Sequence, residues 1–109
     1  MTKEIIKSII QWDIRSWSKA LYYWEEHINA DEINNGLELG SMNGGLSLWL
    51  ALKGKSMVCS DLKDAKKNAE PLHLKYNVTS LIRYEDIDAT NIPYENCFDV
   101  IVFKSIIGG

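Results

Sequence analysis

Residues 36–54 have the sequence GLELGSMNGGLSLWLALKG. The first four residues are typical of a short buried strand, which ends at Gly40. A glycine-bearing turn follows, and residues 46–53 predict a helix that is apolar nearly all round and is closed by Gly54. Because such a helix must be covered on two sides, we expect a sheet below it and an amino-terminal helix above it.

The rest of the chain alternates between predicted helices and strands. Apolar residues recur at helical spacing through residues 2–30, which predicts either one amphipathic helix or two helices that meet near residues 11–16. Further strands are predicted at 56–60, 80–84 and 98–103, and a helix at 62–76, which Pro71 should kink or restart. This order predicts an α/β fold in which a helical cap, residues 1–30, precedes a domain with a mainly parallel sheet, residues 31–109.

Composition limits the classes of protein that the chain can be. Its 109 residues are 46% hydrophobic and 25% charged, which is typical of one soluble domain. With 12 basic and 15 acidic residues, the chain has no charge excess suited to nucleic acid or an anionic membrane. No stretch approaches the roughly 18 apolar residues of a membrane span. We therefore expect a cytoplasmic protein, with Cys59 and Cys97 reduced and no metal site.

Three acidic residues stand at the predicted carboxyl ends of strands. Glu38 closes the first strand, and Asp61 closes the second, at about the 20-residue interval that is usual in nucleotide-binding folds. There a carboxylate can accept hydrogen bonds from both hydroxyls of a ribose. Asp88 follows the third strand, near the expected adenine edge. Each residue alone could instead be a helix cap or a turn acceptor.

Three segments resemble class I S-adenosylmethionine-dependent methyltransferases. Residues 38–45 resemble the E-x-G-x-G-x-G cofactor loop, although Met42 stands where the family has its middle glycine. Residues 60–61 resemble the acidic end of the second strand. Residues 88–94 and 98–101 are similar to the family's D-A-x-x-L-P-[FY] turn and F-D-V-[IV] strand, which is the most specific of the three matches.

The resemblance implies a Rossmann-like, three-layer αβα fold that binds S-adenosylmethionine and methylates an acceptor, for which we favour a small molecule. It implies that Gly40 and Gly44 line the methionine part, that Glu38 supports this end, and that Asp61 holds the ribose. Asp88 and the backbone of Ala89 would meet the adenine. The remaining residues of the predicted cofactor site are Ser41, Leu62 and Lys104. No residue is identified as a catalytic base.

Two other functions stay open. A dinucleotide-binding domain of the NAD type would use Gly40 and Gly45, but its G-x-G-x-x-G pattern fails at Met42 and does not account for Glu38. A non-catalytic remnant that only binds the cofactor is the second alternative.

The remaining expectations concern single residues and the end of the chain. We expect His27 and His73 on the surface, and Asp99 bonded to backbone or loop partners. Because the family fold continues into three more strands, we expect the chain to be a fragment, truncated after its fourth strand. That strand would be an exposed sheet edge through which two copies of the chain could pair.

Overall fold

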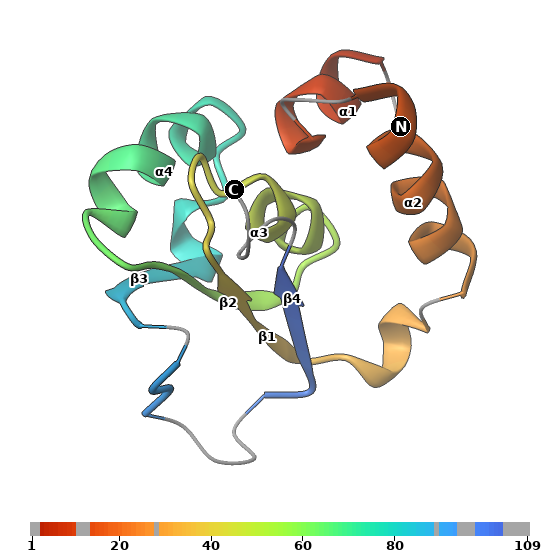
Figure 1. Ribbon diagram of the computed structural model, residues 1–109. Coiled ribbons are helices and arrows are strands. Elements are labelled where there is room, and N and C mark those ends of the chain that lie inside the picture. The colour runs from red at the N-terminus through yellow and green to blue at the C-terminus, as the bar shows by residue number, and fades with distance from the viewer. Residues whose placement is uncertain (1–2, 11–13, 28, 89, 94–97, 104–109) are drawn as a thin grey trace.

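The computed structural model describes residues 3–10, 14–27, 29–88, 90–93 and 98–103 (Figure 1). Its elements alternate much as the sequence predicts. They are, in chain order, α1 (Lys3–Ile10), α2 (Ile14–His27), a 3₁₀ turn (Ala30–Glu32), β1 (Asn35–Leu39), α3 (Gly45–Ala51), β2 (Ser56–Asp61), α4 (Ala65–Lys75), a second 3₁₀ turn (Thr79–Leu81), β3 (Ile82–Asp86) and β4 (Val100–Phe103).

The four strands form one parallel sheet in the order β3-β2-β1-β4. The chain moves outward from β1 through β2 to β3 and then returns to the other side of β1. With right-handed crossovers, this reversal places α3 and α4 on one face and the β3–β4 connection on the other. Figure 1 shows this arrangement. The apolar residues packed on the second face are Leu37, Leu39, Val58, Ile87, Ile92 and Phe98. The sheet is thus covered on both faces, and the Rossmann-like α/β prediction is confirmed.

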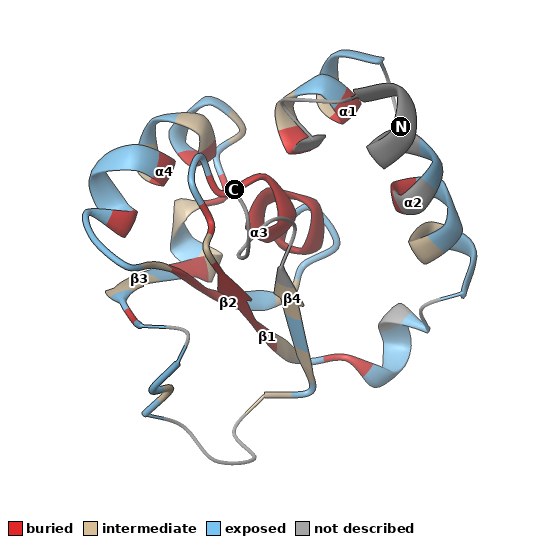
Figure 2. Ribbon diagram, viewed as in Figure 1, coloured by how far each residue is buried: buried red, intermediate tan, exposed pale blue. Residues whose placement is uncertain are grey.

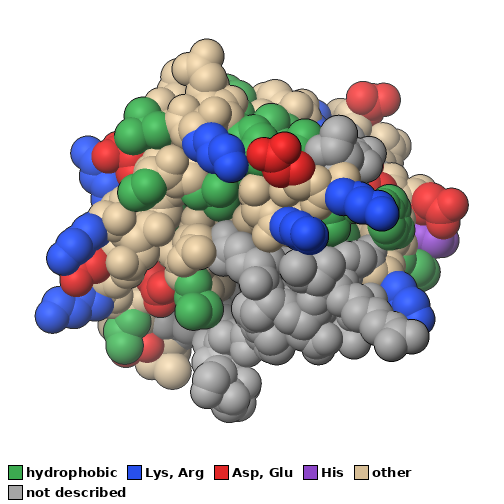
Figure 3. All heavy atoms as spheres, turned by 90° about the horizontal axis from the view of Figure 1, so that it is seen from above, with side chains coloured by type: hydrophobic (Ala, Val, Ile, Leu, Met, Phe, Trp, Pro, Cys, Tyr) green, Lys and Arg blue, Asp and Glu red, His purple; other side chains and the backbone are tan. Residues whose placement is uncertain are grey.

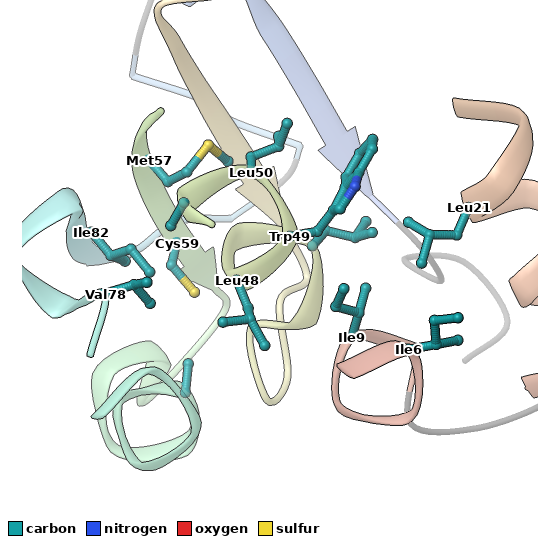
Figure 4. Packing of buried hydrophobic residues seen from close by; sticks show 13 residues of the cluster. Ile6, Ile9, Leu21, Leu48, Trp49, Leu50, Met57, Cys59, Val78 and Ile82 are labelled. Carbon is teal, nitrogen blue, oxygen red and sulfur yellow. The ribbon is translucent and has the colours of Figure 1, made fainter. Parts of the chain in front are cut away.

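Helix α3 lies at the centre of the main core. All seven of its residues are buried, as Figure 2 shows by its continuous red ribbon. Figure 4 shows Ile6 and Ile9 of α1 and Leu21 of α2 on the same side as Trp49, whereas Met57 and Cys59 come from the sheet. The prediction of cover on two sides is therefore confirmed.

Helix α2 is joined to α3 by polar contacts as well as by packing. The indole N–H of Trp49 donates to the Glu25 carboxylate, and Lys53 Nζ lies 2.7 Å from Glu25 Oε1. The rings of Trp24 and Trp49 lie 5.9 Å apart. Glu25 is accordingly a link between the helical cap and the sheet domain.

Two predicted strand boundaries were wrong, and the predicted restart of the helix at Pro71 is absent. Helix α4 continues through Pro71; both Pro71 and Lys67 are exposed, so water can reach the carbonyl that the proline leaves unbonded. Strand β3 begins at Ile82 instead of Ser80, since Thr79–Leu81 form a 3₁₀ turn. Strand β4 begins at Val100 because the Asp99 carboxylate instead accepts the N–H groups of Asn34 and Asn35.

The helical cap contains two helices, because α1 ends at Ile10 and α2 begins at Ile14. Residues 11–13 of the predicted joint lie outside the described residues. None of the helices in the described part of the chain is long and apolar enough to cross a bilayer.

Candidate functional site

The carboxyl ends of the parallel strands meet at one edge of the sheet. There β1 lies between β2 and β4, where the order of connection reverses. In open α/β sheets, ligands bind outside the carboxyl ends of the strands at this switch point. The segment after β1, residues 40–45, is called the glycine loop below. The loop is joined to β2 by a hydrogen bond of 2.9 Å from Ser41 N–H to Ser60 O, and the N–H of Ile87 donates to Asp61 O at 2.8 Å.

The glycine loop has an unusual backbone. Gly40, Met42 and Gly44 have φ angles of 59°, 51° and 75°, in the left-handed region that favours glycine. A hydrogen bond of 2.8 Å from Gly44 N–H to Ser41 O closes the turn. Met42 therefore adopts the backbone conformation that a glycine in the middle of the motif would adopt without strain.

Asp61 holds this loop from the end of β2. Its Oδ2 accepts the N–H of Met42 at 2.9 Å, and its Oδ1 accepts the N–H of Leu62 at 2.8 Å. A carboxylate oxygen can accept two hydrogen bonds, so these two bonds do not use the full acceptor capacity of the group. The side chains of Met42 and Leu62 are 56% and 70% exposed beside it. The arrangement combines a partly exposed acceptor with two apolar side chains.

Glu38 lies below the loop, facing the helix. Its side chain is 2% exposed, and Oε1 accepts both the N–H and the hydroxyl of Ser47, at 2.9 and 2.7 Å. Ser47 is in the first turn of α3, so Glu38 satisfies a backbone donor that a helix start leaves without an intrahelical acceptor. Glu38 therefore caps the start of α3, as one of its two interpretations predicted. Its support of a cofactor stays a prediction.

Asp88 lies on the exposed segment after β3. Its Oδ1 accepts the N–H and the hydroxyl of Thr90, at 2.9 and 2.7 Å, and these bonds hold the pKa of Asp88 below its usual value. Asp88 is therefore a turn acceptor, as one of its two interpretations predicted. Its carboxylate is ionised at neutral pH. Ala89 and Lys104 lie outside the described residues, so their predicted roles have no structural counterpart here.

Ser41 is a predicted site residue whose hydroxyl oxygen is buried without a hydrogen-bond partner in the described part of the chain. The residue as a whole is 5% exposed. A buried hydroxyl without a partner costs free energy, about 1–3 kcal/mol. A polar ligand group at the loop would remove this cost.

Two residues of the site were misjudged or missed. His73, predicted on the surface, is fully buried beneath the glycine loop. The signal for it was the spacing of Ala65, Ala69 and His73, at steps of four, which puts all three on one helix face. Asp86 had no assigned role, yet its Oδ1 accepts the N–H of Ala65 at 3.0 Å and so stabilises the start of α4.

Two other predictions were confirmed. The exposed position of His27 agrees with the prediction for it. Asp99 bonds to backbone, as expected, since its Oδ2 lies 2.8 Å from the N–H of Asn34.

The structure also has a surface hollow away from the carboxyl edge of the sheet. A hollow of about 280 Å³ lies at the amino ends of the strands and is lined in part by Gly36, Met57, Ile82 and Arg83. It contains none of the predicted cofactor residues. Among the residues that the structure describes, no group of three His, Cys, Asp or Glu side chains could hold a metal ion.

The chain is similar to several solved structures, among them the following two. The crystal structure of MccD protein matches with a TM-score of 0.60 and 28% identity, over 74% of this chain and 37% of that one. The crystal structure of the N-terminal domain of human METTL16 in complex with SAH, S-adenosylhomocysteine, matches with a TM-score of 0.52 and 13% identity, over 86% of this chain and 40% of that one. Protein-family models and curated proteins gave no match.

The present chain spans less than half the length of either matched structure. Together with the strand order, these similarities show that it has a class I methyltransferase fold.

Proposed function

We propose that this chain is the cofactor-binding part of an S-adenosylmethionine-dependent methyltransferase. The observation that carries the proposal is the bond from Met42 N–H to Asp61 Oδ2, which brings a ribose-type carboxylate and the glycine loop together at the switch edge. The fold supports it, and one of the similar structures is a complex with SAH.

The residues at the edge fit this cofactor chemically. Asp61 has acceptor capacity for the ribose hydroxyls, Gly40 leaves room for the methionine part, and the buried Ser41 hydroxyl would gain a partner. The ionised Asp88 would accept the adenine amino group. S-adenosylmethionine supplies a methyl group that is activated by a positively charged sulfur.

Positioning is the main task left to the protein. The residues at this edge would orient the bound cofactor toward the acceptor and exclude water, and these two effects would supply most of the acceleration. An alcohol acceptor also needs a general base, whereas a neutral amine does not.

We propose a small-molecule acceptor and a cytoplasmic location. The net charge is -3, and Figure 3 shows Lys and Arg side chains interspersed with Asp and Glu over the face seen from above. Such a mixed surface does not attract a polyanion strongly, which favours a small acceptor over nucleic acid.

Titration calorimetry with S-adenosylmethionine, S-adenosylhomocysteine and NAD tests the proposed function. We expect the first two to bind and NAD not to bind. Binding of NAD alone would favour the dinucleotide alternative, and absence of binding by all three would contradict a cofactor site. Cofactor binding without turnover would leave open a remnant that only binds.

Replacing Asp61 tests the residue that carries the proposal. Asp61→Ala should weaken S-adenosylhomocysteine binding by about 1–3 kcal/mol, because hydrogen bonds to a charged group are lost. The matched pair Asp61→Asn and Asp64→Asn makes the same charge change at two nearby positions, and only the first should weaken binding. Asp64 is exposed and makes no side-chain bond at its helix cap. Unchanged affinity in folded Asp61→Ala would remove Asp61 from the site.

A further inference from the structure

Met42 combines a strained backbone with an exposed apolar side chain. Its φ of 51° lies in the left-handed region, and the residue is 56% exposed to solvent. A residue with a side chain keeps such a conformation only where the surrounding structure holds it, and residues of this kind are concentrated at ligand sites. The proposed function makes no use of the Met42 side chain, although it stands at the carboxyl edge of the sheet.

Asp61 is the group that holds the backbone of Met42. Its Oδ2 accepts the N–H of Met42 at 2.9 Å, and its Oδ1 accepts the N–H of Leu62 at 2.8 Å. The two residues are thus bound to different oxygens of one carboxylate, and Leu62 is 70% exposed. The group that would accept the ribose hydroxyls therefore has an exposed apolar residue beside each of its oxygens.

The backbone N–H groups of this part of the glycine loop are used within the protein. The N–H of Ser41 donates to Ser60 O at 2.9 Å, and the N–H of Gly44 donates to Ser41 O at 2.8 Å. The N–H of Met42 donates to Asp61. A phosphate held by a glycine-rich loop needs such N–H groups, whereas a nucleoside does not. The side chain of Met42 is therefore better placed to contact a ligand than its backbone N–H.

We propose that Met42 is a ligand-binding residue whose thioether packs against the adenosyl group of the cofactor, beside Asp61. The proposal rests on the proposed function, in which Asp61 holds the ribose. A nucleoside has hydroxyls along one edge and apolar atoms on its faces, so a carboxylate flanked by apolar side chains fits it. A thioether also makes favourable contacts with aromatic rings such as adenine.

This contact gives the strained conformation a role. A glycine at position 42 would adopt the same backbone without strain, but it would offer the nucleoside no apolar surface. Burial of the exposed Met42 side chain against the ligand would offset its strain in the complex. The residue should therefore contribute to binding while it lowers the stability of the free protein.

Nuclear magnetic resonance of the chain with ¹³C-labelled methionine methyl groups tests the contact directly. Adenosine and S-adenosylhomocysteine should each shift the Met42 methyl signal, because the ring current of adenine acts on nearby nuclei. Met57 is the internal control, since it is 2% exposed and lies in the main core (Figure 4). Its methyl signal should stay in place. A shift with S-adenosylhomocysteine but not with bound adenosine would overturn the contact with the nucleoside.

Met42→Leu and Met42→Gln separate the apolar contact from effects on the backbone. Both variants keep a side chain of similar length, so both keep the strain. The Leu variant should bind S-adenosylhomocysteine within about twofold of the wild type, and the Gln variant about fivefold more weakly. Leu74→Gln, at an exposed position on α4, is the matched control and should bind as the wild type does. Equal affinities of the two Met42 variants would overturn the proposal.

Met42→Gly separates binding from stability. Because glycine removes the strain and the contact together, this variant should unfold at a higher urea concentration than Met42→Gln but bind S-adenosylhomocysteine about as weakly. A residue with only a structural role would change both quantities in the same direction, so wild-type affinity in Met42→Gly would contradict the contact.

The wild-type chain distinguishes failure of this inference from failure of the proposed function. If calorimetry shows that S-adenosylhomocysteine binds while the Met42 methyl signal does not move, the contact is wrong and the proposed function stands. If neither S-adenosylhomocysteine nor adenosine binds, the proposed function fails, and the role of Met42 fails with it.

Discussion

Met42 adopts a backbone conformation that is unfavourable for a residue with a side chain. Its φ of 51° lies in the left-handed region, which costs a non-glycine residue about 1–2 kcal/mol. The hydrogen bond from its N–H to the Asp61 carboxylate offsets part of this cost. The chain therefore keeps the loop shape of the glycine motif at the expense of local strain, and presents an exposed thioether at the candidate site.

Because of this strain, we expect glycine and alanine substitutions to have opposite orders of stability at positions 42 and 43. At position 42, the Gly variant should be more stable than the Ala variant by about 1 kcal/mol, because only glycine adopts positive φ without strain. At position 43, where φ is not positive, Ala should be the more stable by about 0.5–1 kcal/mol. Urea unfolding of the four variants measures both differences. A more stable Ala variant at position 42 would contradict the strain.

At the scale of elements, Gly45 controls how closely α1 approaches α3. A Cβ atom at Gly45 would lie 1.7 Å from the carbonyl oxygen of Ile9, the penultimate residue of α1. The glycine loop is thus also a contact surface for the helical cap, and Gly45 has a packing role as well as a place in the motif. Both Ile6 and Ile9 are buried by this contact with the core.

We expect Gly45→Ala to release α1 from the core. In the first turn of a helix, alanine is normally more stabilising than glycine. Here the overlap with Ile9 should instead lower the free energy of unfolding, by about 1–3 kcal/mol. Native-state hydrogen exchange should show faster exchange throughout α1. The comparison variant Gly54→Ala introduces a Cβ with nothing within 4 Å but at a φ of 81°, so it should lower the free energy of unfolding without accelerating exchange in α1 selectively. Slow α1 exchange in Gly45→Ala would contradict the close approach.

At the scale of the whole molecule, β4 is the last strand of the described sheet. Its partner is β1, and Ile101 on it is 48% exposed. Ile101 is paired with Leu37, so its side chain lies on the face covered by the β3–β4 connection. An apolar strand at a sheet edge can pair with another chain, and we propose that two copies associate there.

Light scattering over a range of concentrations tests this association. The average mass should rise above that of a monomer as concentration increases, and Ile101→Lys should lower the mass, because a charge on an edge strand opposes pairing. Leu74→Lys is the matched control, since Leu74 is 60% exposed on α4, away from the edge. A monomer at every concentration would contradict the proposal.

Much of the fold could be predicted from local patterns. Apolar periodicity located the helices and strands, and the turn after Leu39 marked the glycine loop, because these signals depend on residues close in sequence. The positions of Asp61 and Asp88 at strand ends followed in the same way. Their hydrogen-bond partners are also local or belong to the adjacent loop.

The tertiary structure alone decided what the remaining polar groups contact. His73 is 29 residues from Gly44, and Asp86 is 21 from Ala65, so no local pattern pairs them. Such pairs form only when the crossovers bring helix, strand and loop together. The sequence by itself determined an α/β chain with a glycine turn and acidic strand ends. Burial of polar groups then decided which side chains support that turn, because a buried donor or acceptor must find its partner wherever the fold places one.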